Sequence, residues 1–271
     1  MGILYVVAGP IGNLGDLSQR AGEILASARL VVAEDTRTTQ RLLEHLGLAK
    51  PLLSYNEHNH RQRVPQVLAT LGAGDVALLS EAGTPAISDP GARLVDEAWQ
   101  AGYQVTPIPG PSAIVAALSA SGFPATLFEF IGFWPRTAGR AAKLLDRLAD
   151  TEATTVAFEA PTRIAKTLPA LAARLPERRL LIAREMTKLH EELLRGTCSE
   201  LAERLVGRSW RGEITMVIEG GAGSPSTEVS EDIQADEGRP GAIARRISRQ
   251  TGLSRRDVYR VLLALGKDVN I

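Results

Sequence analysis

The chain has a single cysteine, Cys198, among its 271 residues. It therefore has no internal disulfide and no cysteine cluster that could hold zinc or an iron–sulfur centre. Its four histidines include one close pair, His58 and His60, in a polar stretch without a third ligand, which favours solvated histidines over a metal site. We expect no metal, and a reducing cytoplasmic setting.

The sequence also has no long apolar run and no net charge of either sign. No run approaches the roughly 20 apolar residues that cross a bilayer, and the first residues enter a strand pattern without the basic start of a signal peptide. We therefore expect no membrane association. The formal net charge is zero, so the chain is not basic along its whole length.

Charge is nevertheless unevenly distributed towards the C-terminus. Residues 228–237 contain acids and no base, whereas residues 239–260 contain seven arginines and one acid. This asymmetry predicts an acidic linker at residues 221–238 and a small basic module at residues 239–271. Two helical patterns broken at Gly252 make the module typical either of a nucleic-acid-binding helix-turn-helix or of a capping helical hairpin.

The rest of the chain alternates strand and helix patterns, which predicts an α/β fold in two domains. In residues 1–121, helical patterns separate five strand-like runs, as in a parallel sheet covered by helices; the runs are residues 4–8, 30–33, 52–55, 76–79 and 104–108. In residues 122–220, strand runs at residues 180–186 and 192–195 have no helix between them, which favours a mixed sheet.

The loop at residues 80–91, SEAGTPAISDPG, follows the apolar strand run at residues 76–79. Ligands of open α/β sheets bind at the carboxyl ends of strands, and a simple connection needs only about two to six residues. The Gly, Pro, Ser and Thr residues of this loop fix its backbone and present hydrogen-bond donors. Asp89 is expected to cap the following helix, with Pro90 as its first residue. An ordinary connection is the alternative.

The loop after the first strand run contains Gly9, Gly12 and Gly15. Their spacing is G-x-x-G-x-x-G, whereas dinucleotide-binding proteins carry G-x-G-x-x-G. Asp16, expected at the N-cap of the next helix, would also repel a pyrophosphate. The pattern favours a tight turn that brings the backbone close to an uncharged or cationic ligand.

Charged residues follow other strand runs, in EDTRT (residues 34–38), FEAPTR (residues 158–163) and REMTK (residues 184–188). A buried Arg–Glu pair at such a position can be purely structural. Lys188, beside Glu185 and Glu191, could instead help a hydroxyl lose its proton. Both interpretations stay open at this point.

Taken together and in this order, these motifs resemble the tetrapyrrole-methylase superfamily of S-adenosylmethionine-dependent methyltransferases, and within it the RNA-modifying branch. The resemblance runs from Leu4 to about Glu219, and the basic C-terminal module is also similar to that branch. The motifs are VAGPIGNLGD (residues 7–16), AEDTR (33–37), SEAGTPAISDPG (80–91), PIPGPSA (107–113), FIGF (130–133), EAPTR (159–163) and REMTK (184–188).

The resemblance implies two α/β domains with S-adenosylmethionine between them, a homodimer, and 2′-O-methylation of a cytidine in the decoding region of 16S rRNA, within the small ribosomal subunit. By position, it implies donor contacts from Pro10, Ser80, Glu81, Ala82, Ile87, Ser112, Ala113, Phe158 and Met186. Lys188 with Glu185 is the favoured general base, Asp35 is the alternative, and no metal is needed. The RNA would bind a basic surface that includes Arg37, Arg245, Arg246, Arg249, Arg255 and Arg256.

Two rival functions stay open. One is a methyltransferase acting on a tetrapyrrole or another small acceptor, with a closed apolar acceptor pocket and no use for the basic tail. The other is a non-enzymatic regulator that senses a nucleotide-like ligand and binds DNA through the tail helices. The second tail helix offers little base-edge chemistry beyond arginine, which argues against DNA readout.

Overall fold

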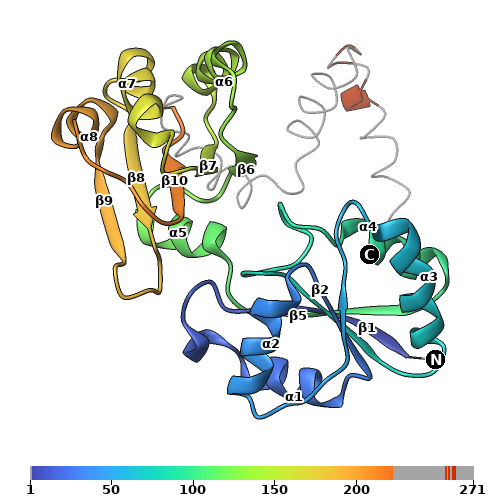
Figure 1. Cartoon of the computed structure of the whole chain (residues 1–271). Helices are drawn as coiled ribbons and strands as arrows, with labels where there is room; N and C mark the ends of the chain where they lie inside the picture. Colours follow the sequence, from blue (N-terminus) through green and yellow to red (C-terminus); the bar gives the residue numbers. More distant parts are fainter. Residues whose placement is uncertain (1, 222–253, 255, 257, 261–271) are drawn as a thin grey trace. The chain divides into compact units, whose positions relative to one another are not determined.

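The computed structural model describes residues 2–221, 254, 256 and 258–260 (Figure 1). The residues up to Gly221 form one compact unit that holds two five-stranded sheets. Across these described ranges, no helix has the length and apolar character needed to span a bilayer.

The first sheet is entirely parallel, as the alternating pattern predicts. Its strands are β1 (Ile3–Val7), β2 (Leu30–Ala33), β3 (Leu52–Ser54), β4 (Val76–Leu79) and β5 (Gln104–Ile108), in the order β3-β2-β4-β1-β5. The central strand β4 is buried at every position, which explains its continuous apolar run, since both faces of a parallel sheet are covered.

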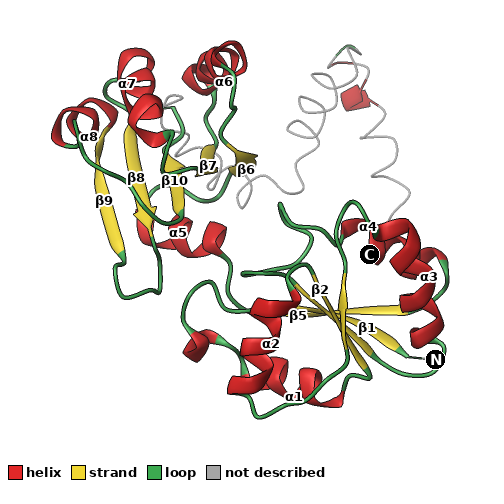
Figure 2. Ribbon diagram, viewed as in Figure 1, coloured by secondary structure: helices red, strands yellow, loops and turns green. Residues whose placement is uncertain are grey.

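Helices cover both faces of this sheet (Figure 2). On one face Leu25 of α1 (Gln19–Ser27) and Leu43 of α2 (Thr36–His45) pack in the same cluster. On the other face the cluster includes Val67 of α3 (His60–Leu71) and Leu94 of α4 (Ala92–Gln100). The predicted α/β architecture is therefore confirmed for this part of the chain.

Two expected helix starts are wrong by two residues. The N-cap of α1 is Ser18, whose Oγ accepts a hydrogen bond from the Ala21 N–H at 3.1 Å, whereas Asp16 ends a short 3-10 turn (Leu14–Asp16). The N-cap of α4 is Gly91, with a φ of 134° that favours glycine. Asp89 therefore does not cap α4, and its carboxylate is left for other contacts.

The second sheet is mixed, also as predicted. Its strands are β6 (Phe128–Phe133), β7 (Thr154–Glu159), β8 (Arg179–Arg184), β9 (Glu192–Thr197) and β10 (Ile214–Ile218), in the order β6-β7-β10-β8-β9. Only β6 and β7 are parallel; the other neighbours are antiparallel. One face packs against α6 (Ala138–Asp150), α7 (Ile164–Arg174) and α8 (Cys198–Arg204).

The other face of the second sheet is covered by α5 (Ala113–Ser121), which follows the last strand of the first sheet. Ile114, Ala117 and Leu118 of α5 cluster with residues of β7, β8 and β10. Because the N-terminus of α5 continues directly from the loop after β5, this helix links the two sheets.

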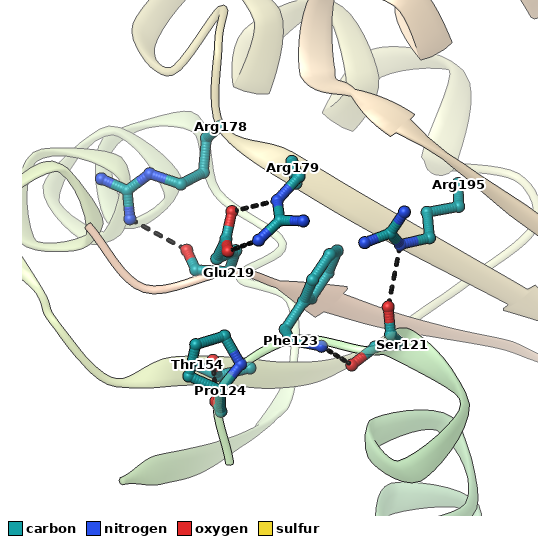
Figure 3. Close-up of polar contacts among 8 residues, drawn as sticks. All are labelled: Ser121, Phe123, Pro124, Thr154, Arg178, Arg179, Arg195 and Glu219. Atoms are coloured by element: carbon teal, nitrogen blue, oxygen red, sulfur yellow. Dashed lines mark hydrogen bonds and ion pairs between the residues drawn. The ribbon is translucent and has the colours of Figure 1, made fainter. Parts of the chain in front are cut away.

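The turn after α5 is held by residues of the second sheet (Figure 3). The Arg195 Nε donates to the Ser121 carbonyl oxygen at 2.8 Å, at the C-terminus of α5. The Phe123 ring contacts two guanidinium groups, with its centroid 5.2 Å from the Arg179 Cζ and 5.0 Å from the Arg195 Cζ. Arg179 is in turn paired with Glu219 beyond β10. These contacts fix α5 on its sheet.

Most of the predicted C-terminal elements lie outside the described residues, namely residues 222–238 of the linker and nearly all of the basic module. Within that module Arg256 and residues 258–260 are helical, and the Val258 N–H donates to the Ser254 carbonyl at 3.1 Å.

Candidate active site

A cavity of about 420 Å³ is lined by residues from both sheets. The loops after β1, β4 and β5 supply one part of its wall. The rest comes from the ends of β6, β7 and β8, the loops after β7 and β8, and the start of β10 with the two residues before it. The lining includes most residues that we expected to contact a methyl donor: Glu81, Ala82, Ile87, Ser112, Ala113, Phe158 and Met186. The loops that follow β1, β4, β5, β7 and β8 therefore meet around one cavity, whereas residues 34–38 do not line it.

The remaining two expected donor residues, Pro10 and Ser80, line a neighbouring hollow of about 380 Å³. Lys188 lines it too. The two hollows have some lining residues in common, namely Ile11, Glu81, Ala82 and Glu213. The two hollows therefore adjoin and share part of their walls.

Backbone hydrogen bonds tie the loops of the first sheet together. The Gly9 N–H donates to the Gly83 carbonyl at 2.8 Å, and the Gly83 N–H donates to the Pro10 carbonyl at 3.3 Å. The Thr84 hydroxyl donates to the Pro111 carbonyl at 3.2 Å. These bonds connect the loops after β1, β4 and β5, so the cavity wall is a fixed surface on which a ligand can be positioned.

Gly83 is required at its place in this wall. Its φ is +74°, and a β-carbon there would stand 3.2 Å from the Ile11 Cγ2. Ser80, which is 5% exposed, donates its hydroxyl to the Gly83 carbonyl at 3.0 Å. The glycine allows the turn, and the buried serine holds it.

Aromatic side chains form the apolar part of the wall. The Phe158 ring packs edge-on against Phe130, with centroids 5.0 Å apart, and against Phe133, with centroids 5.5 Å apart. Phe133 is nonetheless 61% exposed, and Ile87 of the opposite loop is 47% exposed. Large apolar side chains that line a cavity and remain this exposed are available to contact a ligand.

Three carboxylates lie near one another on the side of the first sheet. Burial raises the pKa of Asp89 to about 6, and the negative charges of Glu34 and Glu81 add to the shift. Burial also raises the pKa of Glu34, and Glu81 contributes to this shift as well. The cavity is therefore electronegative on this side, which suits a cationic ligand and disfavours a phosphate.

Glu159 gives the second sheet a buried anion in the cavity wall. It is 2% exposed, and its Oε1 lies 2.6 Å from the Arg163 Nη2. Its Oε2 accepts from the Thr167 hydroxyl at 2.5 Å, and its Oε1 accepts from the Ala160 N–H at 2.7 Å. This carboxylate is fully occupied by protein partners, so its role is to hold the turn after β7.

Lys188 lies between two carboxylates. Its Nζ is 3.0 Å from the Glu185 Oε1 and 2.9 Å from the Glu213 Oε2. Burial alone would lower the pKa of Lys188, but the hydrogen bonds and charges of Glu213 and Glu185 outweigh it and raise this pKa. A hydrogen bond from the Glu213 backbone holds the pKa of Glu185 below its usual value. Near neutral pH this lysine is a cation without a free electron pair, and Glu185 is a weaker base than an ordinary glutamate, so both are poorly suited to accept a proton.

Asp35, the alternative general base, is not among the residues lining either hollow. It is the N-cap of α2, and its Oδ1 accepts from the Arg37 N–H at 2.8 Å. That backbone hydrogen bond holds the pKa of Asp35 below its ordinary value. Its observed role is the local one of capping a helix.

The expected RNA-binding arginines are only partly described. The side chain of Arg37 is 90% exposed, and Arg256 is exposed on its short helical stretch. The other four, Arg245, Arg246, Arg249 and Arg255, lie outside the described residues. Within the part of the chain that the structure covers, no group of three or more His, Cys, Asp or Glu side chains is arranged to hold a metal ion.

Three residues of the site were not singled out by the sequence analysis for a role in it. Asp89 was assigned to a helix cap, Phe133 was named only within the FIGF motif, and Glu213 was given no role. The signal that could have found them is their position in the chain. Asp89 lies in the loop after β4, Phe133 is the last residue of β6, and Glu213 immediately precedes β10. Nothing in the spacing shows that Glu213 would pair with Lys188.

Comparison with known proteins places this geometry in a class. The family model for tetrapyrrole (corrin/porphyrin) methylases matches residues 3–202. Two solved structures share the fold: uroporphyrin-III-C-methyltransferase from Thermus thermophilus (TM-score 0.57, 20% identity, 81% of this chain and 94% of that one) and diphthine synthase (TM-score 0.62, 15% identity, 81% and 90%). The solved structures show the fold of this class, and the family model makes the chain a methyltransferase of the tetrapyrrole methylase family.

The more similar relatives carry one name. A Synechocystis sp. protein named "Ribosomal RNA small subunit methyltransferase I" is 41% identical over 278 residues, covering 99% of this chain and 100% of the relative. A Thermotoga maritima protein with the same name is 45% identical over 221 residues, covering 81% of this chain and 99% of the relative. This chain belongs to the tetrapyrrole methylase family, in the group that bears that name.

Proposed function

We propose that this protein transfers a methyl group from S-adenosylmethionine to the 2′-oxygen of a cytidine in the decoding region of 16S rRNA. The observation that carries the proposal is the similarity to the Synechocystis protein, which spans 99% of the chain and includes every loop of the cavity. Its name gives ribosomal RNA as the substrate of that relative. We extend the substrate to this chain, and the nucleotide and the atom follow from the resemblance of the motifs.

The cavity fits the proposed donor in size and charge. Its volume of about 420 Å³ lies within the roughly 300–1,000 Å³ of small-molecule sites. The carboxylates of Glu81 and Asp89 suit a positively charged sulfonium, and the wall has apolar surface from Phe158 and Met186 for the rest of the molecule. When bound, S-adenosylmethionine supplies an electrophilic methyl group.

The residues of this chain then position the reactants. We assign donor binding to the residues expected from the motifs: Pro10, Ser80, Glu81, Ala82, Ile87, Ser112, Ala113, Phe158 and Met186. Ser112 is the N-cap of α5, yet its hydroxyl makes no capping bond, so it is available to a ligand. Correct orientation of two reactants supplies up to about 7–11 kcal/mol of barrier reduction, and the fixed loops are suited to this task.

The proposed RNA partner is the small ribosomal subunit in the cytoplasm, with this protein acting as a homodimer without a metal. Arg37, Arg256 and the arginines of the basic module are proposed to contact phosphates. Such contacts make the affinity fall as salt rises. The target ribose is expected in a single-stranded or splayed segment, where its 2′-hydroxyl can be aligned.

The test is methyl transfer from labelled S-adenosylmethionine to small ribosomal subunits that lack this modification, followed by digestion to nucleosides. We expect the label in 2′-O-methylcytidine. Ala113→Phe, which fills the cavity, should abolish the label, whereas Val115→Phe on the exposed side of α5 should keep it. Label in tetrapyrrole precursors and none in RNA would replace the proposal with the small-acceptor alternative.

A further inference from the structure

Four ionisable side chains line the larger cavity: Glu81, Asp89, Glu159 and Glu213. Glu159 is paired with Arg163, and Glu213 with Lys188. Among the described residues, no cation forms an ion pair with Glu81 or Asp89. Of these two, Glu81 is exposed and lines both hollows, whereas Asp89 is half-buried and lines only the larger one.

The backbone that carries Asp89 has an unusual shape. Ala86 and Ser88 have φ values of 68° and 61°, in the left-handed region that side chains with a β-carbon disfavour. Gly91 then turns the chain with a φ of 134°, so α4 begins only at Ala92. The loop thus keeps the Asp89 carboxylate at the cavity wall and out of the helix cap. Strained backbone of this kind persists where the surrounding structure fixes it, often at functional sites.

We propose that Asp89 is the general base of the methyl transfer, accepting the proton of the attacking ribose hydroxyl. This inference rests on the proposed function and adds a residue to it. The 2′-oxygen uses its electron pair to form the O–CH₃ bond while the bond between the methyl carbon and sulfur breaks, and that bonding pair stays on sulfur. The hydroxyl proton moves to the Asp89 carboxylate, which later releases it to water.

The surroundings of Asp89 match this role. Burial, Glu34 and Glu81 raise its pKa to about 6, so it is ionised near neutral pH and still a far better proton acceptor than an ordinary aspartate. Glu34 at the end of β2 and Glu81 in the same loop are the charged groups that act on it. The carboxylates on the second sheet are both paired: Glu159 with Arg163, and Glu213 with Lys188, which it shares with Glu185.

The candidates suggested by the sequence alone have environments of the opposite kind. Lys188 is stabilised as a cation by Glu213 and Glu185, and the pKa values of Glu185 and Asp35 are held below their ordinary values. Lys188 is already protonated near neutral pH and has no free electron pair for a proton, and Glu185 and Asp35 are weaker bases than ordinary carboxylates. We therefore assign Lys188 and Glu185 to positioning, where they join the loop after β8 to β10.

The first experiment compares Asp89→Asn with wild type on small ribosomal subunits across a range of pH. The wild-type kcat should rise with pH as Asp89 loses its proton near pH 6. This rise is the acid limb of the pH profile. Loss of a general base lowers the rate by about 10²–10⁴-fold, and Asp89→Asn should show such a loss in kcat with no acid limb. The kcat is measured at saturating S-adenosylmethionine, because Asp89→Asn also removes a negative charge from the donor cavity. A cooperative urea transition shows that the variant is folded. Asp96→Asn, an exposed aspartate on α4, serves as the control with unchanged kinetics.

The second experiment uses Glu34→Gln, which removes a neighbouring negative charge without touching the cavity wall. The pKa of Asp89 should fall, and the acid limb should move to lower pH. Carbon NMR of the Asp89 carboxyl group, assigned by its absence in Asp89→Asn, gives the same pKa in the protein alone. The limb and the NMR titration should shift together in Glu34→Gln.

Three outcomes would overturn the assignment. The first is a wild-type kcat in Asp89→Asn, and the second is an acid limb that is lost in Glu81→Gln but kept in Asp89→Asn. The third is an acid limb that stays fixed in Glu34→Gln while the NMR titration of Asp89 moves. Each of these leaves RNA methylation by the wild-type protein intact. Absence of methylation by the wild type is the separate result that refutes the proposed function.

Discussion

The side chain of Lys188 lies directly over Gly12, so that a β-carbon added to Gly12 would overlap the Lys188 methylene groups. Gly12 belongs to the loop after β1, and Lys188 follows β8 in the second sheet. The ammonium group beyond this contact is held by Glu185 and Glu213. The absence of a side chain at Gly12 is therefore what lets the two loops approach at the smaller hollow.

Gly12→Ala is expected to destabilise the protein. The added methyl group must displace Lys188, and overpacking of this kind costs about 1–3 kcal/mol in the free energy of unfolding. The φ of 155° at Gly12 adds strain. Urea denaturation measures the effect. Gly22→Ala in α1 is the matched control, because its β-carbon meets no atom within 4 Å; it should gain about 0.5–1 kcal/mol. Equal effects of both substitutions would refute the contact.

Glu159→Gln is expected to weaken folding without introducing a cavity. The amide has the same shape, but it has lost the charge that pairs with Arg163 at 2.6 Å, and it must present an N–H₂ group towards a donor. Leaving such buried groups unsatisfied costs about 1–3 kcal/mol. Asp146→Asn, which breaks the exposed pair with Arg174, should cost no more than about 0.5–1 kcal/mol. The two variants are compared by urea denaturation at neutral pH.

Phe123→Leu tests the clamp on α5. Leucine keeps an apolar side chain but has no ring for the Arg179 and Arg195 guanidinium groups, and cation–π contacts contribute about 0.5–2 kcal/mol each. The free energy of unfolding should fall accordingly. Because α5 carries Ser112 and Ala113 into the cavity, calorimetric affinity for S-adenosylmethionine should fall as well. Phe128→Leu, at a 43% exposed ring of β6, should alter neither quantity appreciably.

Asp89→Asn should stabilise the protein in alkaline solution. The folded pKa of Asp89, about 6, is above its ordinary value of 3.8, so the folded state holds the proton more tightly than the unfolded state. Ionisation therefore destabilises the fold above pH 6, and this effect disappears as the pH falls below about 4. With solvent screening, we expect asparagine to add about 1–2 kcal/mol at pH 8 and almost nothing at pH 4. Urea denaturation at the two pH values decides this.

Cys198 should be unreactive in the native protein. It is fully buried at the first position of α8, and burial raises the pKa of its thiol to about 12. The thiolate is the reactive form, so a thiol reagent at pH 8 should label the protein only when it unfolds. Rapid labelling under native conditions would show that this region opens.

The strands were predictable because buried strand positions are occupied by apolar residues. The run Val76–Leu79 is apolar at every position because β4 is central, and the gap without a helix between β8 and β9 revealed the mixed sheet. The loops around the cavity were predictable from their glycine and proline content. These signals come from residues that are neighbours in the sequence, so a short stretch of sequence is enough to predict each strand or loop.

The chemistry of the site depends on contacts that local patterns do not record. The start of α4 was misplaced because Ala86 and Ser88 adopt positive φ values that their residue types disfavour, and Asp89 was consequently assigned to a cap. The charge state of Lys188 depends on Glu213, which lies 25 positions away in the chain. Only the fold brings these residues together.

The cavity wall contains Ile11 from the first loop and Thr215 from the last strand. A molecule bound there touches segments from opposite ends of the compact unit, so neither sheet can unfold without releasing it. A ligand at 100 times its dissociation constant adds about 2.7 kcal/mol to stability, and here this gain is shared by both halves. With the proposed methyl donor in this cavity, the free energy of unfolding of the protein is expected to rise with the concentration of its own substrate.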